Sequence, residues 1–460
     1  MGNTERRKIR VPDSSEKLSV LAEHTVVGGG IAGLATAIEL AMLSDSVVLI
    51  EPKVRPDLRS LFVRGDILSQ LPYLEVDLDT AITGWKYHAA QSSIDLNFKL
   101  PNPTSVSEAY FMIDHERIIQ AMRQEFLKRG GQIISEGSKG QVVGVIDLPD
   151  KIILQLSDNG LLQTRRIIDA TGKKSTIVRN TYNSDNQPVF NEGDPIVMWV
   201  FGKSFETGWP DNLDKTIFTP VVTNSGRVSW AAPYGDGRFD VVASDYCHLS
   251  DLTKPSQIKT MKQMFGNLLS ICHSNGIHPE DSGKPIFGAV RLMPMKNNNS
   301  HNVLAVGEAA GYPSPFMAES ITPAILHAPV TAQMMTHGAT PATHLQHWKH
   351  KDPTFPYEVE TALLHQRLVH QQAGNNAPFY AQATAGLNEG ERRTLLHARK
   401  IGASTLLRRA PQLLLDRSFL SWGAKFGYTF LTLLAHDGQF TESQTNKHLF
   451  PGINYPVENS

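Results

Sequence analysis

The sequence predicts an α/β protein. It should contain a Rossmann-like domain with a parallel sheet, an inserted domain with a mostly antiparallel sheet, and a helical C-terminal region. Three observations lead to this prediction. A short apolar strand at residues 25–27 enters a glycine-rich turn and a helix, residues 190–290 are rich in β-branched and aromatic side chains, and the chain from residue 343 onward has a helical pattern. The first pattern is typical of parallel sheets, and the second of antiparallel ones.

The parallel domain is organised around residues 24–51. Gly28, Gly30 and Gly33 have the G-x-G-x-x-G spacing between a strand and a helix, and a second strand at residues 47–50 ends in Glu51. Such glycines permit a tight turn, a close approach of the backbone to a pyrophosphate, and helix packing, while the acid suits ribose hydroxyls. This order of elements favours a dinucleotide site over a plain structural turn. The candidate binding residues are Gly28, Gly30, Ile31, Ala32, Gly33 and Glu51.

Composition narrows the function classes. The 460 residues are 41% hydrophobic, which supports sizeable cores. A net charge of −1 gives no reason to expect nucleic acid or a polyanionic substrate. Two cysteines indicate a reducing, cytoplasmic setting without a disulfide framework. Residues 1–22 lack the apolar core of a secretory signal, and we expect a flexible leader there.

The elements after Glu51 follow from periodicity. We expect a basic loop and then a short helix to Leu71, with Arg59 or Arg64 either contacting a cofactor phosphate or solvated. Residues 81–113 alternate like strands, residues 114–129 form an amphipathic helix, and strands follow at 133–134, 142–146, 152–154 and 167–170. The second sheet should contain residues 198–201, 216–218, 228–230 and 239–242. A helix over 257–272 has Ser256 as its expected N-cap, a buried strand covers 303–306, and a helix with a kink at Pro329 covers 321–335.

Three motifs together resemble flavoproteins of the p-hydroxybenzoate hydroxylase fold, over residues 24–335. The first is the glycine turn with Glu51, the second is Asp-Ala-Thr-Gly-Lys-Lys-Ser at 169–175, and the third is Gly-Glu-Ala-Ala-Gly-Tyr-Pro-Ser-Pro at 307–315. That family includes aromatic hydroxylases, alkene epoxidases, halogenases, geranylgeranyl reductases and some lycopene cyclases. The resemblance implies FAD as the cofactor and a sheet domain above the flavin.

The resemblance also implies a split domain organisation. The FAD-binding domain would comprise residues 23–80, 114–185 and 291–340, and the substrate domain residues 81–113 and 186–290. Residues 341–460 would form the helical region. Within it, residues 418–435 are expected to be a core helix rather than a membrane-contacting one. His344, His347 and His350 have the spacing i, i+3, i+6, which does not keep three side chains on one side of a helix, so we predict no metal site there.

The third motif departs from the family at its acid. The family places an aspartate on the ribityl hydroxyls of the flavin, and Glu308 stands here instead, one methylene longer. The family's two following glycines are replaced by Ala318 and Ser320, whose backbone amides could face the pyrimidine edge of the ring. The cofactor residues implied by this motif are Gly307, Glu308, Ala309, Pro315, Ala318 and Ser320.

The second motif bears on the electron donor. Hydroxylases that use NAD(P)H carry Asp-Gly here and a later Arg, whereas this chain has Thr171-Gly172 and Val178. The pattern is more similar to halogenases and reductase-like members. NAD(P)H therefore stays a candidate donor, with a reductase partner or reduced flavin as alternatives. In the helix at 114, His115 stands where the family often has an FAD-contacting Arg, and Arg117 is the nearest candidate.

Residues 228–237 resemble the Trp-x-x-Pro strand of halogenases and geranylgeranyl reductases. Val228 replaces the first Trp of the halogenases, and Lys86 is a candidate for their catalytic lysine. Trp230 is interpreted as a substrate contact or, alternatively, as a core residue. We expect an apolar substrate pocket, and its candidate lining residues are Phe201, Phe218 and Trp230 on one wall and Pro313 and Phe316 on the other.

These features predict an FAD-dependent oxidoreductase. We expect a monooxygenase that hydroxylates or epoxidises an apolar small molecule through the flavin C4a-hydroperoxide of the family. The alternatives are an alkene (isoprenoid) reductase, cyclase or halogenase of the same fold, and a non-catalytic FAD-fold binding protein. Glu51 and Glu308 argue against the last alternative. No side chain stands out as a catalytic acid or base, because the cofactor carries the chemistry.

Overall fold

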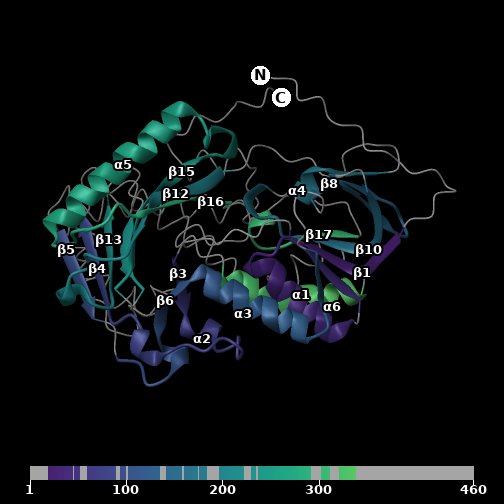
Figure 1. Ribbon diagram of the computed structural model, residues 1–460, viewed down its shortest axis with the longest axis horizontal. Coiled ribbons are helices and arrows are strands. Elements are labelled where there is room, and N and C mark those ends of the chain that lie inside the picture. The colour runs from purple at the N-terminus through teal and green to yellow at the C-terminus, as the bar shows by residue number, and fades with distance from the viewer. Residues whose placement is uncertain are drawn as a thin grey trace, which may run out of the picture.

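The computed structural model describes two sheets, a two-stranded ribbon and the helices around them (Figure 1). The described residues are 19–44, 46–51, 60–89, 94–99, 102–134, 141–157, 160–174, 176–183, 196–221, 229–234, 237–291, 302–310 and 321–337. The predicted C-terminal helical region, the histidines at 344–350 and the segment 418–435 lie outside these residues. So do five predicted site residues and one loop arginine: Pro313, Pro315, Phe316, Ala318, Ser320 and Arg59.

The first sheet has eight strands in the order β11-β8-β9-β10-β1-β2-β7, and β17 also pairs with β10. Strands β17, β10, β1, β2 and β7 are parallel, as predicted, and β9 pairs antiparallel with both β10 and β8. The strands are β1 Ser19–Val27, β2 Val47–Ile50, β7 Gln132–Ile134, β8 Val142–Asp147, β9 Ile152–Leu156, β10 Leu161–Asp169, β11 Thr181–Tyr182 and β17 Val303–Ala305.

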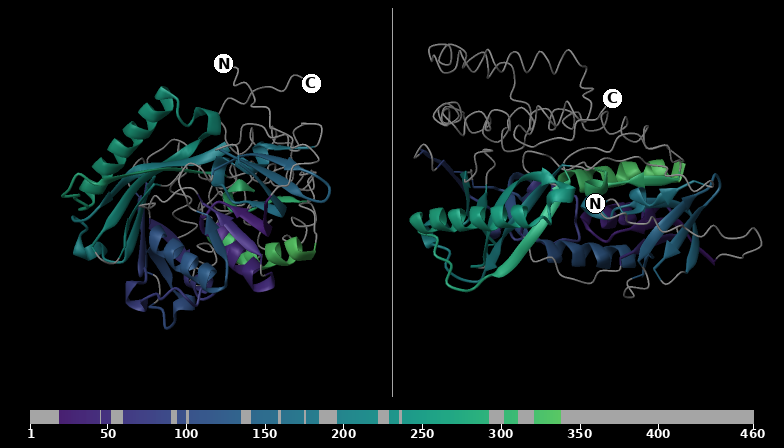
Figure 2. Two further views of the ribbon diagram at one scale, coloured as in Figure 1. Left: turned by 45° about the vertical axis from the view of Figure 1, so that its right-hand side comes forward. Right: turned by 90° about the horizontal axis from the view of Figure 1, so that it is seen from above.

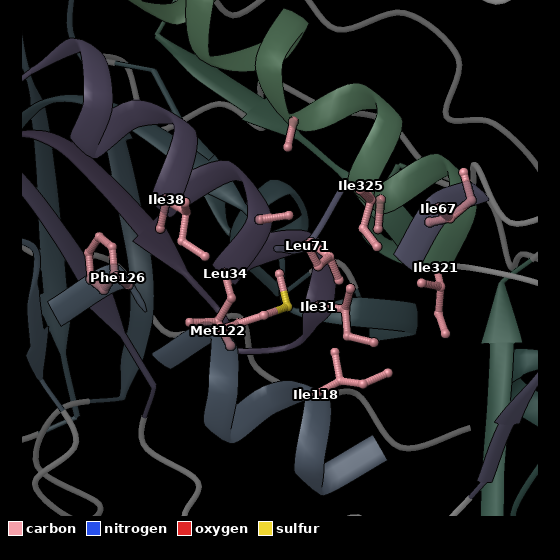
Figure 3. Packing of buried hydrophobic residues seen from close by; sticks show 14 of the residues in the cluster. Ile31, Leu34, Ile38, Ile67, Leu71, Ile118, Met122, Phe126, Ile321 and Ile325 are labelled. Atoms are coloured by element: carbon pink, nitrogen blue, oxygen red, sulfur yellow. The ribbon is translucent and has the colours of Figure 1, made fainter. Parts of the chain in front are cut away.

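Three helices cover one face of this sheet: α1 (Ile31–Leu43), α3 (His115–Lys128) and α6 (Ile321–His337). Their apolar side chains meet buried strand residues in one core, which includes Leu34, Met122 and Ile325 (Figure 3). On the opposite face, residues of the parallel strands share a second core with residues of β8, β9 and the short helix α4 (Thr176–Arg179). The helices at 114–129 and 321–335 are thus confirmed, and Pro329 lies inside α6.

The second sheet has seven strands in the order β16-β12-β15-β14-β13-β4-β5. All neighbours are antiparallel except β13 and β4, so the prediction of a mostly antiparallel sheet is confirmed. Helix α5 (Pro255–Ser274) covers its outer face (Figures 1 and 2). The strands are β4 Gly84–Ala89, β5 Ile94–Lys99, β12 Ile196–Phe205, β13 Thr216–Val221, β14 Trp230–Pro233, β15 Phe239–His248 and β16 Lys284–Arg291.

A two-stranded ribbon, β3 (Ser60–Arg64) with β6 (Tyr110–Asp114), joins the two sheets. Val63 is buried in the core of α1 and α3, whereas its neighbour Phe62 packs against the inner face of the seven-stranded sheet. The ribbon therefore contributes one side chain face to each core, because side chains alternate along a strand.

Three local predictions were wrong. The basic loop after Glu51 was expected to lead into a helix, but residues 60–64 form β3 and the helix is only α2, Gly65–Leu68. Residues 19–22 belong to β1 instead of a leader. Helix α5 begins at Pro255 with Lys254 as N-cap, because proline fits the first helical position where no N–H bond is needed. No helix within the described residues is long and apolar enough to cross a membrane.

Candidate functional site

The three sequence motifs meet at one edge of the parallel sheet. Val27 of β1 pairs with both Ile50 of β2 and Asp169 of β10, and Asp169 pairs with Ala305 of β17. Each motif follows one of these strand ends directly. Backbone hydrogen bonds hold these strand ends together: the Gly28 amide donates to the Ile50 carbonyl oxygen at 2.9 Å. In parallel α/β sheets, this carboxyl edge is where ligands bind.

The glycine turn is built from two tight glycines and one open one. Gly28 has φ +111°, and a Cβ there would lie 2.2 Å from the Ala170 carbonyl oxygen. A Cβ on Gly33 would lie 1.9 Å from the Gly28 carbonyl oxygen. A Cβ on Gly30, in contrast, would meet no atom within 4 Å. The chain is therefore tightly packed on the protein side of the turn and open where a ligand's phosphates would approach.

The start of α1 offers backbone donors beside that open position. Gly30 is the N-cap, no side chain caps the helix, and no acidic residue lies in its first turn. The first amides of an α-helix have no intrahelical acceptor, and they carry the positive end of the helix dipole. Ile31 and Ala32 thus present the kind of donors that bind a pyrophosphate.

Glu51 is held beside the same turn. Its Oε2 accepts a hydrogen bond from the Gly29 amide at 2.5 Å, and a Cβ on Gly29 would lie 2.8 Å from the Glu51 Cγ. The carboxylate is therefore fixed against the glycine turn at the end of β2. This is the position from which an acid can bind ribose hydroxyls.

Asp169 organises the second motif, a role that the sequence did not reveal. The fully buried carboxylate accepts hydrogen bonds from the Thr171 amide (2.9 Å), the Thr171 hydroxyl (2.6 Å) and the Val178 amide (2.9 Å). Burial raises the pKa of Asp169, and these hydrogen bonds act in the opposite direction. Asp169 shapes the turn from behind, so Thr171 and Gly172 form the surface of the site.

The third motif touches both of the others. Gly307 has φ +56°, and a Cβ there would lie 2.5 Å from the Ala32 Cβ of α1. Glu308 points toward the second motif, because its Oε2 lies 3.7 Å from the position of a Cβ on Gly172. Ala309 is buried in the core behind the site. The described parts of the three motifs thus form one continuous surface around the N-terminus of α1.

Two of the three arginine candidates lie within the described residues, and both have protein partners. Arg64 is buried and binds Asp66, with Nε 2.9 Å from Oδ1. Arg117 is exposed and donates to the Glu75 carbonyl at 2.5 Å. These bonds account for the positions of both side chains without a bound phosphate, so contact of either arginine with a cofactor stays a prediction.

The three aromatic substrate candidates lie on opposite faces of the seven-stranded sheet. Phe218 is fully buried in the core under α5, and Phe201 packs edge-on against Phe265 of that helix at 5.8 Å. Trp230 lies on the inner face. The three residues therefore cannot form one wall, because the side chains of a strand point alternately to the two faces of the sheet, and these three do not share a face. Lys86 also points to the α5 side, where its ammonium group donates to Asn275 at 2.8 Å.

Trp230 instead belongs to an aromatic cluster on the inner face. Phe62 of the ribbon contacts Trp85 edge-on at 5.6 Å and stacks on Tyr110 at 5.4 Å. Phe62, Trp85 and Trp230 are only partly buried, whereas the apolar residues packed around them, such as Ile217, are buried. Phe62 and Trp85 were not among the predicted substrate residues, since their proximity depends on pairing between distant strands.

The structure is similar to solved structures of a reductase-like protein, a flavin-dependent brominase and PqsL. A geranylgeranyl bacteriochlorophyll reductase-like protein from Thermoplasma acidophilum aligns with TM-score 0.65 and 13% identity, over 85% of this chain and 96% of that chain. The flavin-dependent brominase Bmp2 aligns with TM-score 0.58 and 14% identity, over 82% and 92%. Pseudomonas aeruginosa PqsL in complex with 2-aminobenzoylacetate aligns with TM-score 0.53 and 15% identity, over 77% and 98%.

No protein-family model matches the chain, and no curated protein matches it in sequence. The structural similarity covers most of each neighbour at low identity, so it defines the fold. The chain has the fold of FAD-dependent oxidoreductases and monooxygenases, as the three motifs predicted.

Proposed function

We propose that this protein is an FAD-dependent oxidoreductase. The observation that carries the proposal is the convergence of the three motifs around Gly30, where the backbone is open to a ligand while Gly28 and Gly33 are closed against protein. Donor amides at the start of α1 suit the pyrophosphate, and the carboxylate of Glu51 suits the adenosine ribose. These residues fit FAD chemically.

Each part of the site has a distinct task in this proposal. The amides of Ile31 and Ala32 bind the pyrophosphate, and Glu308 binds polyol hydroxyls between the second motif and α1. Thr171 and Gly172 present backbone to the same cofactor. Bound FAD would supply electron transfer and the reaction with oxygen, while the protein binds, orients and excludes water.

The substrate of our proposal is an apolar small molecule, and the reaction is oxygen insertion by hydroxylation or epoxidation. The support is the inner-face aromatic cluster, where Phe62, Trp85 and Trp230 keep part of their surface uncovered by the protein core. Aromatic and aliphatic walls bind apolar molecules and exclude water from the reacting atoms. This cluster replaces Phe201 and Phe218 as the basis of the substrate proposal.

Three other activities of the same fold remain alternatives. The similarity to a reductase-like protein and to a brominase keeps alkene reduction, cyclisation and halogenation in view. The halogenase alternative loses its one candidate lysine, because Lys86 lies on the face covered by α5. A non-catalytic binding protein is disfavoured by the carboxylates of Glu51 and Glu308, which we propose bind cofactor hydroxyls.

The electron donor is proposed to be a separate reductase or reduced flavin, with NAD(P)H as the second candidate. Thr171 and Val178 occupy the positions where NAD(P)H-using hydroxylases carry an acid and an arginine. Val178 is buried, and its amide is bound to Asp169, so it offers no charge to a nicotinamide nucleotide.

Flavin release tests the cofactor directly. The purified protein should be yellow, and denaturation should release non-covalent FAD that is identified by its absorbance and mass. A protein that releases no flavin, and that added FAD neither binds nor stabilises, would contradict the proposal. Aerobic product analysis with lipophilic alkenes and arenes then separates oxygen insertion from reduction, since the products differ by one oxygen atom or by two hydrogen atoms.

A further inference from the structure

A chain of polar contacts leads from the seven-stranded sheet to the start of α3. Asp240 of β15 is buried, and both its oxygens accept from the Tyr234 hydroxyl, at 3.0 and 2.9 Å. The guanidinium of Arg238 lies over the Tyr234 ring, 5.0 Å from its centre. Arg238 Nη1 in turn lies 3.7 Å from Asp114 Oδ2. The hydrogen bond of Tyr234 to the buried Asp240 thus fixes the position of an arginine that reaches across to the other sheet's helix.

Asp114 has two separate tasks. It is the N-cap of α3, where its Oδ1 accepts from the Glu116 amide at 2.9 Å. Its other oxygen faces Arg238. One carboxylate therefore joins the first turn of the helix to the hairpin that follows β14.

The first turn of α3 packs against the first turn of α1. Figure 3 shows Ile118 of α3 facing Ile31 of α1, with Met122 next to Leu34 one turn further along both helices. Ile31 directly follows Gly30, the open position of the glycine turn. A shift in the start of α3 is therefore transmitted to the amides proposed to bind the pyrophosphate, because close-packed cores transmit small displacements.

We propose that Arg238 and Asp114 are positioning residues that join the seven-stranded sheet to the glycine turn, and that this ion pair raises the affinity for FAD. The inference rests on the proposed FAD function. The pair fixes the start of α3, α3 supports Ile31, and Ile31 carries one of the donor amides. In the reverse direction, bound FAD stabilises the position of the hairpin next to the substrate face, since coupling between sites is reciprocal.

Two single variants and their combination test the proposal. Asp114→Asn keeps the helix cap, since asparagine caps as well as aspartate, but removes the charge that faces Arg238. Arg238→Met keeps the length of the side chain and removes the guanidinium. The matched control is Arg165→Met, which breaks the 3.0 Å ion pair of Arg165 with Glu23 in the middle of β1.

The readouts are the FAD dissociation constant, measured by flavin fluorescence, and the melting temperature of the FAD-free protein. Each single variant should weaken FAD binding about three- to fivefold, the size that a partly exposed ion pair supports. The double variant should be no weaker than either single one, because both remove the same pair. The loss should shrink in 1 M salt, which screens the pair. The FAD affinity of the control variant should equal that of wild type. The melting temperatures of all the FAD-free variants should also equal that of FAD-free wild type.

Three results would overturn the inference: unchanged FAD affinity in both single variants, fully multiplicative losses in the double variant, or losses that follow a lower melting temperature of the FAD-free protein. Failure of wild-type protein to bind FAD refutes the proposed function itself and the inference with it. Normal binding by wild type and by both variants refutes only the positioning role.

Discussion

Gly30 and Gly33, three positions apart in the glycine turn, should respond to substitution in opposite ways. At Gly30 the backbone has φ −73° and ψ 177°, which any residue can adopt, and an added Cβ meets nothing within 4 Å. At Gly33 an added Cβ would lie 1.9 Å from the Gly28 carbonyl oxygen. The first position should therefore be constrained by the ligand, and the second by the fold.

Gly30→Val should leave the FAD-free protein folded, at a cost of about 1 kcal/mol for the poorer N-cap. It should weaken FAD binding at least about 100-fold, or about 2.7 kcal/mol, because the side chain fills the space that the pyrophosphate needs. Gly33→Ala should cost about 1–3 kcal/mol or more in folding free energy, since backbone has to move away from the new methyl group.

Urea unfolding of the FAD-free proteins and fluorescence titration with FAD measure both quantities. Gly30→Val should lose affinity with little loss of stability, and Gly33→Ala should lose stability even when FAD is absent. The reasoning would be refuted if Gly30→Val bound FAD like wild type. It would also be refuted if Gly33→Ala were as stable as wild type.

Three further predictions concern the donor, the second motif and the substrate face. With Thr171 and Val178 in the second motif, anaerobic stopped-flow should give flavin reduction by NAD(P)H slower than about 10 per second, and faster reduction would restore NAD(P)H as the donor. Asp169→Asn should lower the free energy of unfolding in urea by about 2–3 kcal/mol, because the NH2 group that replaces Oδ2 cannot accept from the Val178 N–H; an unchanged midpoint would contradict this. Trp230→Ala should keep FAD bound but release more hydrogen peroxide per electron pair, whereas Phe218→Ala should instead cost about 3–5 kcal/mol of stability. Unchanged peroxide release in Trp230→Ala would remove Trp230 from the substrate face.

The parallel sheet and its glycine turn could be predicted because their determinants are local. Gly28, Gly30 and Gly33 lie close together in the sequence, β2 beside them is a continuous apolar run, and β1 ends in two valines. Asp169 could not be assigned a role in advance, since its hydrogen bonds to Thr171 and Val178 depend on how the chain folds back after β10. An acid at the end of a buried strand, followed by small residues, is the available signal for such a turn.

Strand β3 was missed because its partner lies far away in the sequence. Residues 60–64 pair with residues 110–114, and no turn signal links the two segments. The basic residues around it suggested a loop. The pairing brings Phe62 against Trp85 and Tyr110, which are separated from it by 23 and 48 positions, so the aromatic cluster could not be predicted from neighbours in the chain.

Phe201, Phe218 and Trp230 do not share the one wall that was predicted for them, because alternation along a strand does not identify which face of a sheet is covered. Phe218 and Trp230 are both aromatic strand residues, yet α5 covers the first and leaves the second on the inner face. The twenty-residue helix α5 packs on one face of the sheet and buries the side chains there, so a ligand can reach only the side chains of the other face. Lys86 follows the same rule, since it lies opposite Phe218 in the parallel β4–β13 pair and shares its face. The position of α5, more than the composition of the strands, therefore determines which aromatic residues can contact a substrate.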